Sequence, residues 1–534
     1  MELKPGLGRY GWLAAIAIAY LYVFPYFPRI HSANELPRAY LVKAIVEDHT
    51  FAIDRGVAAW GSTADVSPSG GHLYSNKAPG ASLLAVPAYA AVRLVGGEPS
   101  LAATLWIGRV FAGIAPMLAF LWLLWGSLSR FAPDPDVRRL VLLAYALGSL
   151  AMTYSILFYS HQLGAICIAS AWILALDVAD GKRGLGAMAA AGLLAGAAPL
   201  ADYQAAFAAV PVAVHVLVRF RLRRRASVDA AATATPGSAE VPTAVVVRSA
   251  PGASTSPPML RALAVAAVAA ALPIALLLAY HAACFGSPWR TGYDASTTFA
   301  VYHQRGFLGI TALRWAAFSG SLVHIDNGLL ALSPWWVIAL PGTIALWRSG
   351  QRGAAVVGVA VAAIYVLFIS SINFWRGGWE VGPRYIAAML PFLLPAVAAQ
   401  LQAWAARPLR LAVAAGAIGV AVCVYVLSSA TFPYWPDSFR HPLFDVTLRL
   451  LGDNLVAPSL GSALGVAGIA GIAPYLAVGL GAPGLVIWRL TGTRGLAIAV
   501  GLTAAILLAY GRVPHGDPRA EAAYRSVRAA VVDL

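Results

Sequence analysis

Apolar blocks of about twenty residues recur along the whole chain, and short polar breaks separate them. Each block has the length that an α-helix needs to cross the hydrocarbon core of a bilayer. Because 60% of the 534 residues are hydrophobic and only 11% are charged, too few polar side chains remain to cover a soluble fold of this size. The sequence therefore predicts an all-α polytopic membrane protein.

Hydropathy predicts about thirteen transmembrane helices. We place them near residues 10–28, 104–128, 139–157, 162–179, 185–200, 203–219, 261–283, 327–347, 353–372, 385–405, 409–429, 465–488 and 496–510. The first block lacks a convincing small-residue cleavage site, so we expect it to be retained as a helix. A further apolar stretch, residues 80–96, is interrupted by Pro87 and Arg93. Whether this stretch spans the membrane decides the orientation of every later helix.

Clustered arginines settle that orientation. If 80–96 does not span, the arginine-bearing loops all fall on the side of the N-terminus, while the short turns at 159–162 and 201–204, which lack Lys and Arg, fall on the other. This is the distribution that the positive-inside rule expects. We therefore predict that 80–96 is a juxtamembrane or re-entrant helix. The net charge of +15 then reflects topology rather than a surface for nucleic acid.

The resulting map places the N-terminus in the cytoplasm and the tail, residues 511–534, outside. An N-terminal transmembrane module, residues 1–220, contains the first outer loop at 29–103. A C-terminal transmembrane module, residues 261–510, contains the outer loops 284–326 and 430–464. Between the modules, residues 221–260 are rich in Ala, Pro, Ser and Thr, so we expect a disordered cytoplasmic linker.

The first outer loop is dense in polar side chains beside the membrane. Glu35 follows the first helix, where a carboxylate could act as general base toward an acceptor hydroxyl. The simpler interpretation is an interfacial charge paired with Arg38 at helical spacing. Asp54 is a second candidate carboxylate. The other substrate-binding candidates of this loop are Asn34, Arg38, His72, Tyr74 and Asn76.

Basic residues stand where a lipid phosphate would lie. Lys77 immediately precedes the stretch 80–96, although a lysine that merely snorkels to the interface is the simpler interpretation. A later polar run contributes Arg376, Glu380 and Arg384, and Arg384 leads into a span, where its guanidinium can bind phosphate bidentately. Further candidates near the outer ends of spans are His161, Asp202, His324 and Asp326, each of which could equally be a structural hydrogen-bond partner or helix cap.

Three short motifs resemble those of a known family. They are Asn34-Glu35-Leu36-Pro37-Arg38, Ser75-Asn76-Lys77-Ala78-Pro79-Gly80 and Gly382-Pro383-Arg384-Tyr385. In them the chain resembles the integral-membrane C-type glycosyltransferases that use polyprenyl-phosphate sugars, in particular protein O-mannosyltransferases and lipid A aminoarabinose transferases. The resemblance implies a catalytic carboxylate at Glu35 and donor-phosphate binding by Lys77 and Arg384. The acidic pair of that family is usually Asp-Glu, whereas Asn34 stands first here, so Asp54 remains a candidate for the base.

We therefore expect an inverting transfer of a hexosyl or pentosyl group from a polyprenyl-phosphate donor to a lipid, glycan or protein acceptor. Glu35 would take the acceptor proton, and Lys77, Arg384 and Arg376 would stabilise the departing phosphate. The reaction would face the periplasm or cell exterior from the inner (plasma) membrane. The alternative is a transporter or flippase of a lipid-linked sugar or other anion, and a third interpretation is a non-catalytic scaffold. A divalent cation could assist at phosphate, but no carboxylate cluster predicts a metal site.

Overall fold

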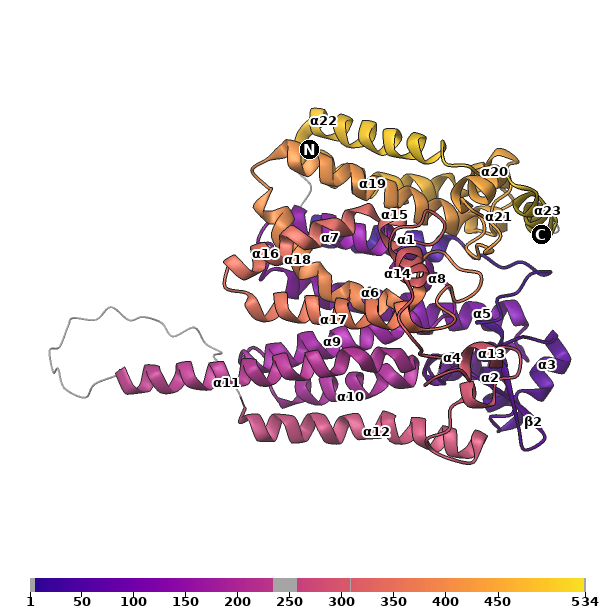
Figure 1. Cartoon of the computed structure of the whole chain (residues 1–534), viewed down its shortest axis with the longest axis horizontal. Helices are drawn as coiled ribbons and strands as arrows, with labels where there is room; N and C mark the ends of the chain where they lie inside the picture. The colour runs from indigo at the N-terminus through magenta and orange to yellow at the C-terminus, as the bar shows by residue number, and fades with distance from the viewer. Residues whose placement is uncertain (1–4, 234–256, 308, 533–534) are drawn as a thin grey trace.

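The structure, a computed structural model, describes residues 5–233, 257–307 and 309–532. Its long helices run roughly side by side, and the outer segments pack together at the right end of Figure 1. Short 3₁₀ and π turns, labelled η, interrupt several helices. The first half of the chain contains α1 (Pro5–Tyr22), α2 (Leu36–Lys43), η1 (Ala44–Asp48), α3 (Asp54–Trp60), β1 (Val66–Ser69), β2 (His72–Ser75), α4 (Gly80–Gly96), α5 (Leu101–Arg109), η2 (Val110–Ile114), α6 (Ala115–Leu128), α7 (Pro135–Leu147), α8 (Leu150–Ile156), α9 (His161–Ala179), α10 (Leu185–Ala201), η3 (Tyr203–Ala208) and α11 (Ala209–Thr233).

The second half begins with α12, which is highly apolar. Its elements are α12 (Met259–Phe285), η4 (Gly292–Ala295), α13 (Ala300–His303), α14 (Trp315–Leu322), α15 (Leu329–Leu332), η5 (Pro334–Ile338), α16 (Ala339–Arg348), α17 (Arg352–Ser371), η6 (Arg384–Met389), α18 (Leu390–Ala403), α19 (Pro408–Ala430), η7 (Leu443–Thr447), α20 (Leu448–Gly452), α21 (Leu460–Ala463), α22 (Gly468–Tyr510) and α23 (Pro518–Val532). The α11 helix continues through residues 221–233, the start of the expected linker, and residues 234–256 lie outside the described residues.

Eight of the described helices are long and apolar enough to cross a membrane, or nine if the bent pair α7 and α8 forms one span. Every one of the thirteen predicted segments has a helical counterpart, but not each as a separate full-length helix. The apolar parts of α1 and α10 are shorter, residues 329–348 form a broken run, and α22 covers two predicted spans. Gly492 interrupts α22 with φ +70°. The chain is thus a multi-pass, largely helical membrane protein, whereas a count of thirteen spans is not confirmed.

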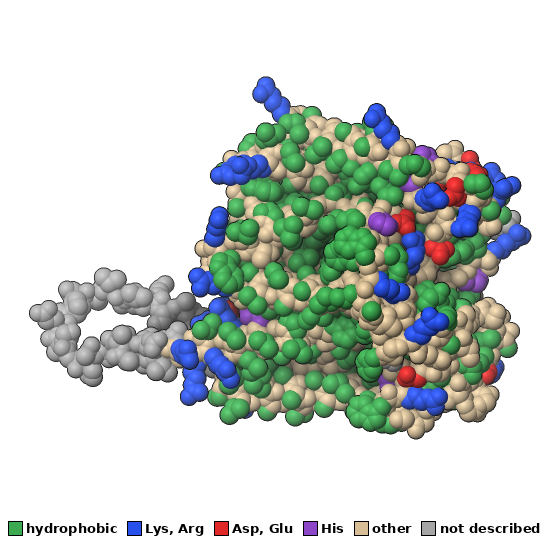
Figure 2. All heavy atoms as spheres, in the orientation of Figure 1, with side chains coloured by type: hydrophobic (Ala, Val, Ile, Leu, Met, Phe, Trp, Pro, Cys, Tyr) green, Lys and Arg blue, Asp and Glu red, His purple; other side chains and the backbone are tan. Residues whose placement is uncertain are grey.

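The loops predicted to share the basic cytoplasmic side meet at one end of the bundle. Asp177 contacts Arg130 and Arg183, and Asp180 contacts Arg130 and Arg219. In Figure 2 the visible middle of the molecule is mostly hydrophobic, and Asp and Glu gather toward the right end. The structure thus brings together arginine-bearing loops that are far apart in the sequence.

The first outer loop folds as α2, α3, a hairpin and α4 at the opposite end (Figure 1). The hairpin pairs β1 with β2 through a two-residue turn at Gly70 and Gly71, whose φ angles are +57° and +83°. Such a turn needs two left-handed residues, which glycine adopts without strain. The hairpin register places Val66 opposite Ser75, so Asp65 and Asn76 meet just beyond the paired strands. The predicted juxtamembrane segment is α4, a 17-residue apolar helix that lies with these outer elements.

Candidate functional site

Glu35 lies immediately before α2 and is fully engaged by protein partners. Arg109 donates to both of its carboxylate oxygens, from Nε and Nη2, at 2.9 Å each. The Tyr434 hydroxyl donates at 2.7 Å, and the Phe158 amide donates at 2.5 Å. Burial alone would raise the pKa of Glu35, but the Arg109 charge and these hydrogen bonds outweigh it and hold the pKa below its usual value. Glu35 is therefore a carboxylate anion whose hydrogen-bond partners are supplied by the protein, and only 2% of the residue is exposed.

Arg38 lies one turn further along α2 and is equally buried. Its Nη1 donates to the backbone and side-chain oxygens of Asn34, and its Nη2 donates to the Ser160 hydroxyl at 2.7 Å. Pro37 fits the first turn of α2, where no backbone donor is required. The Asn34-Glu35-Leu-Pro-Arg38 motif thus builds a short helix that holds one cation and one amide at the protein interior.

The hairpin holds a second charged group, the pair of Asp65 and Lys77. Lys77 Nζ lies 2.9 Å from Asp65 Oδ2, and Asn76 Nδ2 donates to Asp65 Oδ1 at 3.1 Å. Burial lowers the pKa of Lys77 to about 8, although Asp65 partly offsets this. Burial would raise the pKa of Asp65, but Lys77 and Asn76 outweigh it and keep the pKa low. Both groups are therefore charged at neutral pH.

Arg384 reaches the same region from η6. Its Nε lies 3.0 Å from Glu380 Oε2, and its Nη2 donates to the Gly377 carbonyl at 2.5 Å. Gly377 has φ +72°, and a Cβ there would come within 2.7 Å of Glu380 Oε2, so only glycine fits this turn. The guanidinium also lies over the ring of Tyr159, 5.4 Å from its centre. Burial raises the pKa of Glu380 to about 8, although Arg384 lowers it.

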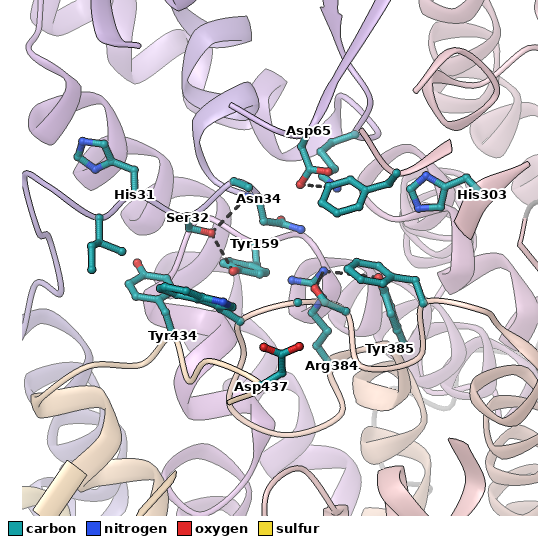
Figure 3. A pocket seen from close by; sticks show the side chains of 18 of the residues that line it. His31, Ser32, Asn34, Asp65, Tyr159, His303, Arg384, Tyr385, Tyr434 and Asp437 are labelled. Atoms are coloured by element: carbon teal, nitrogen blue, oxygen red, sulfur yellow. Dashed lines mark hydrogen bonds and ion pairs between the residues drawn. The ribbon is translucent and has the colours of Figure 1, made fainter. Parts of the chain in front are cut away.

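These groups surround a cavity of about 560 Å³. Figure 3 shows Asp65 and Asp437 on opposite sides of it, with Arg384 between them in that view. All three predicted outer segments contribute to its wall, together with the polar run before η6. The lining residues are Arg29, Ile30, His31, Ser32, Ala33, Asn34, Asp65, Lys77, Tyr159, Tyr293, Phe299, His303, Phe374, Gly377, Gly378, Trp379, Arg384, Tyr385, Tyr434 and Asp437.

The cavity lies within the size range of small-molecule sites, which is about 300–1,000 Å³. One part of its wall is cationic, because Lys77 and Arg384 are both buried there. Another part is aromatic: Phe299 and Phe374 stack in a tilted pair with their ring centres 5.1 Å apart. Such a space suits a ligand with one anionic group and one amphipathic body.

Of the predicted site residues, Asn34, Lys77 and Arg384 line this cavity, and Arg38 lies behind Asn34. Asn76 and Glu380 do not line it but contact residues that do. His161 and Asp202 form a partly buried pair next to it, with His161 Nδ1 2.7 Å from Asp202 Oδ2. Glu35 is not among the lining residues; its carboxylate accepts a hydrogen bond from the lining residue Tyr434, and its backbone amide donates to the carbonyl of Ser32, which also lines the cavity.

The remaining predicted residues lie elsewhere. Asp54 accepts a hydrogen bond from the Leu73 amide and contacts His72 at 3.2 Å, at an exposed edge of the hairpin. Tyr74 packs against Phe285. Arg376 forms an ion pair with Asp326, and His324 is exposed in the preceding turn.

Two carboxylates of the cavity, Asp65 and Asp437, were not singled out from the sequence. Asp65 could have been found from the Gly70-Gly71 turn, because that turn fixes a register in which Asp65 faces the residue before Lys77. No comparable local signal marks Asp437, which reaches the cavity from the third outer loop. Among the described residues, no group of three or more His, Cys, Asp or Glu side chains could hold a metal ion.

Comparison with known proteins adds little to this geometry. No protein-family model matches the chain, and no curated protein matches it either. Among solved structures, the chain is similar to the crystal structure of ArnT from Cupriavidus metallidurans in the apo state, at 12% sequence identity and a TM-score of 0.45. The match covers 93% of this chain and 75% of that chain. A similarity of this degree does not establish a family or an activity.

Proposed function

We propose that this protein transfers a sugar from a polyprenyl-phosphate donor to an acceptor hydroxyl, at a site on the outer side of the plasma membrane. The observation that carries the proposal is a pair of buried cations, Lys77 and Arg384, in the wall of a cavity that also holds the carboxylate of Asp65. Two cations fit a donor phosphate, and a carboxylate fits a proton acceptor. The motif resemblance described above supports the same reaction class.

The donor phosphate would occupy the space between Lys77 and Arg384. Lys77 is held by Asp65 at 2.9 Å, so an entering phosphate competes with Asp65 for the same ammonium group. Once the ammonium turns to the phosphate, Asp65 loses its main stabilising partner, and its proton affinity rises. Donor binding would thereby prepare the base.

The chemical step is then a single displacement at the anomeric carbon. The acceptor oxygen forms a bond to that carbon as the bond from the carbon to the phosphate oxygen breaks, and the electron pair stays on the phosphate. The acceptor proton moves to Asp65, while Lys77 and Arg384 stabilise the leaving polyprenyl phosphate. Attack opposite the leaving group inverts the configuration of the sugar.

Glu35 has a different role in this proposal. Its oxygens already accept four hydrogen bonds, and its pKa is held low, so it is a poor proton acceptor. We propose that Glu35 ties α2 to α5 and to the third outer loop through Arg109 and Tyr434, and so positions Asn34 and Arg38. Asp54, which is exposed beside His72, would hold the hairpin.

The proposal is tested with purified protein in lipid nanodiscs and a panel of radiolabelled polyprenyl-phosphate sugars. We expect one donor to be consumed, and Lys77→Ala, Arg384→Ala and Asp65→Asn each to abolish most transfer. Asp48→Asn is the matched control, because Asp48 belongs to the same loop but pairs with exposed Arg55 away from the cavity.

Failure of folded wild-type protein to transfer or hydrolyse any donor would contradict the proposal. Movement of an unchanged donor across vesicle membranes that contain the protein would instead indicate the transporter alternative.

A further inference from the structure

A histidine–aspartate pair lies beside the cavity and is not used by the reaction proposed above. His161 begins α9, and Asp202 links α10 to η3. Asp202 Oδ2 lies 2.7 Å from His161 Nδ1 and also accepts a hydrogen bond from Gln204 Nε2 at 3.0 Å. Because the carboxylate accepts, Nδ1 carries the proton, so neutral His161 presents a lone pair at Nε2.

That lone pair has nothing to bind in the protein. His161 is 6% exposed, and its Nε2 is buried without a hydrogen-bond partner. The Nε donor of Arg38 is also buried and without a partner. An unpaired buried polar atom costs about 1–3 kcal/mol. An acceptor and a donor left unsatisfied on two residues that line the same pocket therefore indicate a ligand group that satisfies both.

Both residues line a small pocket of about 10 Å³. This pocket adjoins the large cavity, because both are lined by Asn34, Lys77, Arg384 and Tyr385. A volume near 10–15 Å³ holds about one water-sized group. A phosphate or carboxylate is too large for it, and a methyl group could neither donate to His161 nor accept from Arg38. A hydroxyl is small enough for the pocket, can donate to His161 Nε2 and can accept from Arg38 Nε.

We propose that this pocket binds the C2 hydroxyl of the transferred sugar, an inference that rests on the proposed function. Lys77 and Arg384, which would hold the phosphate on C1, also line the small pocket, so the hydroxyl on the adjacent carbon is the one within reach. The hydroxyl donates to His161 Nε2 and accepts from Arg38 Nε. Asp202 is a positioning residue that fixes the tautomer of His161.

The substrate class follows from this arrangement. The protein takes donors with a free C2 hydroxyl, and the pocket excludes donors with an acetamido group at C2, because an acetamido group is several times larger than the space. A site built to bind a hydroxyl discriminates strongly against an analogue without it, since its own polar groups are then left unpaired. Hydrogen bonds to this hydroxyl also strengthen in the transition state of glycosyl transfer.

The test compares three polyprenyl-phosphate donors: the sugar identified in the donor panel, its 2-deoxy analogue and its 2-acetamido-2-deoxy analogue. In wild-type protein we expect kcat/KM for the 2-deoxy donor to be lower by about 10²-fold or more, and no transfer from the acetamido donor. In His161→Ala and Asp202→Asn, we expect the parent donor to lose most of this advantage, while transfer from the 2-deoxy donor changes little.

A merely structural role of the pair would lower transfer from the parent and 2-deoxy donors equally, and that result would overturn the inference. Equal use of both donors by the wild type would also overturn it. His161→Asn provides a second variant if His161→Ala does not fold. Absence of transfer from every donor by folded wild-type protein would instead contradict the proposed function. Arg384→Ala is the control for the donor ratio, because it should lower transfer from the parent and 2-deoxy donors by the same factor.

Discussion

The two ends of the helix bundle carry similar charged residues but use them differently. At the basic end, Asp177 and Asp180 lie among arginines from the turn after α6, from the loop after α9 and from α11, and each carboxylate contacts at least two of them. At the opposite end, Lys77 and Arg384 line a cavity, and the adjoining His161 and Arg38 keep buried nitrogen atoms without a hydrogen-bond partner. Charge density at a membrane boundary therefore does not mark a site by itself. Buried polar atoms that lack a hydrogen-bond partner and lie beside a cavity are the better indication of a site.

The largest effect should come from Asp65, the carboxylate in the cavity wall that we propose as the base. We expect Asp65→Asn to lower kcat by about 10²- to 10⁴-fold, because the variant cannot accept the acceptor proton. The binding of a non-transferable donor analogue should not weaken, because its phosphate no longer competes with a carboxylate for the Lys77 ammonium group. Single-turnover transfer and equilibrium binding of that analogue measure the two effects separately. Near-normal kcat in this variant would move the base to Asp437.

Glu35 should affect stability more than chemistry, although it belongs to the same end of the molecule. Removing one partner of a buried ion pair costs about 3–5 kcal/mol, so Glu35→Gln should lower the midpoint of thermal unfolding clearly. The double variant Glu35→Gln with Arg109→Met should recover part of that loss, because no unpaired guanidinium then stays buried. Unfolding followed by tryptophan fluorescence in detergent checks this expectation.

The opposite outcome for Glu35 is equally informative. If Glu35→Gln unfolds at the wild-type temperature and yet loses transfer per folded molecule, Glu35 is the base that the sequence motif suggested. The contrast between a carboxylate outside the cavity, Glu35, and a carboxylate in its wall, Asp65, would then fail as a guide to function.

Lys77 supplies a pH-dependent test. Its pKa is lowered to about 8 by burial, so the ammonium that would hold the donor phosphate is present below that pH and lost above it. We expect kcat/KM to fall by about tenfold for each pH unit above 8. In Lys77→Arg the guanidinium stays charged, so this alkaline decline should disappear even if the overall rate is lower. A wild-type profile that stays flat to pH 10 would contradict phosphate binding by Lys77.

The sequence predicted the helices better than the contacts between them. Each of the thirteen hydropathy blocks has a helical counterpart, because the bilayer imposes a length that short windows reveal, whereas short helices such as α2 and α23 were not predicted. The motifs around Asn34, Lys77 and Arg384 also identified three residues that line the cavity. These signals are local, so one chain segment is enough to read them.

What the sequence could not show are partners that only the fold brings together. Arg109 lies 74 residues from Glu35 and 325 residues from Tyr434 in the sequence, and nothing in the three segments marks them as partners. The 80–96 segment is a similar case, because charge predicted its position but not the α4 packing against α2 and α5. Whether a carboxylate is satisfied or free depends on such contacts.

The smallest effect should come from the basic end. Arg183 pairs with Asp177, and its side chain is 50% exposed. Arg130 still contacts Asp177 when Arg183 is removed, so the carboxylate keeps a partner. Exposed ion pairs contribute about 0–1 kcal/mol. We therefore expect Arg183→Ala to keep transfer within about twofold of wild type and to shift the unfolding midpoint only slightly. A large loss of transfer here would show that the two ends are coupled through the helices. The distinction between ion pairs that only support the fold and cations that line a cavity and serve a site would then no longer hold.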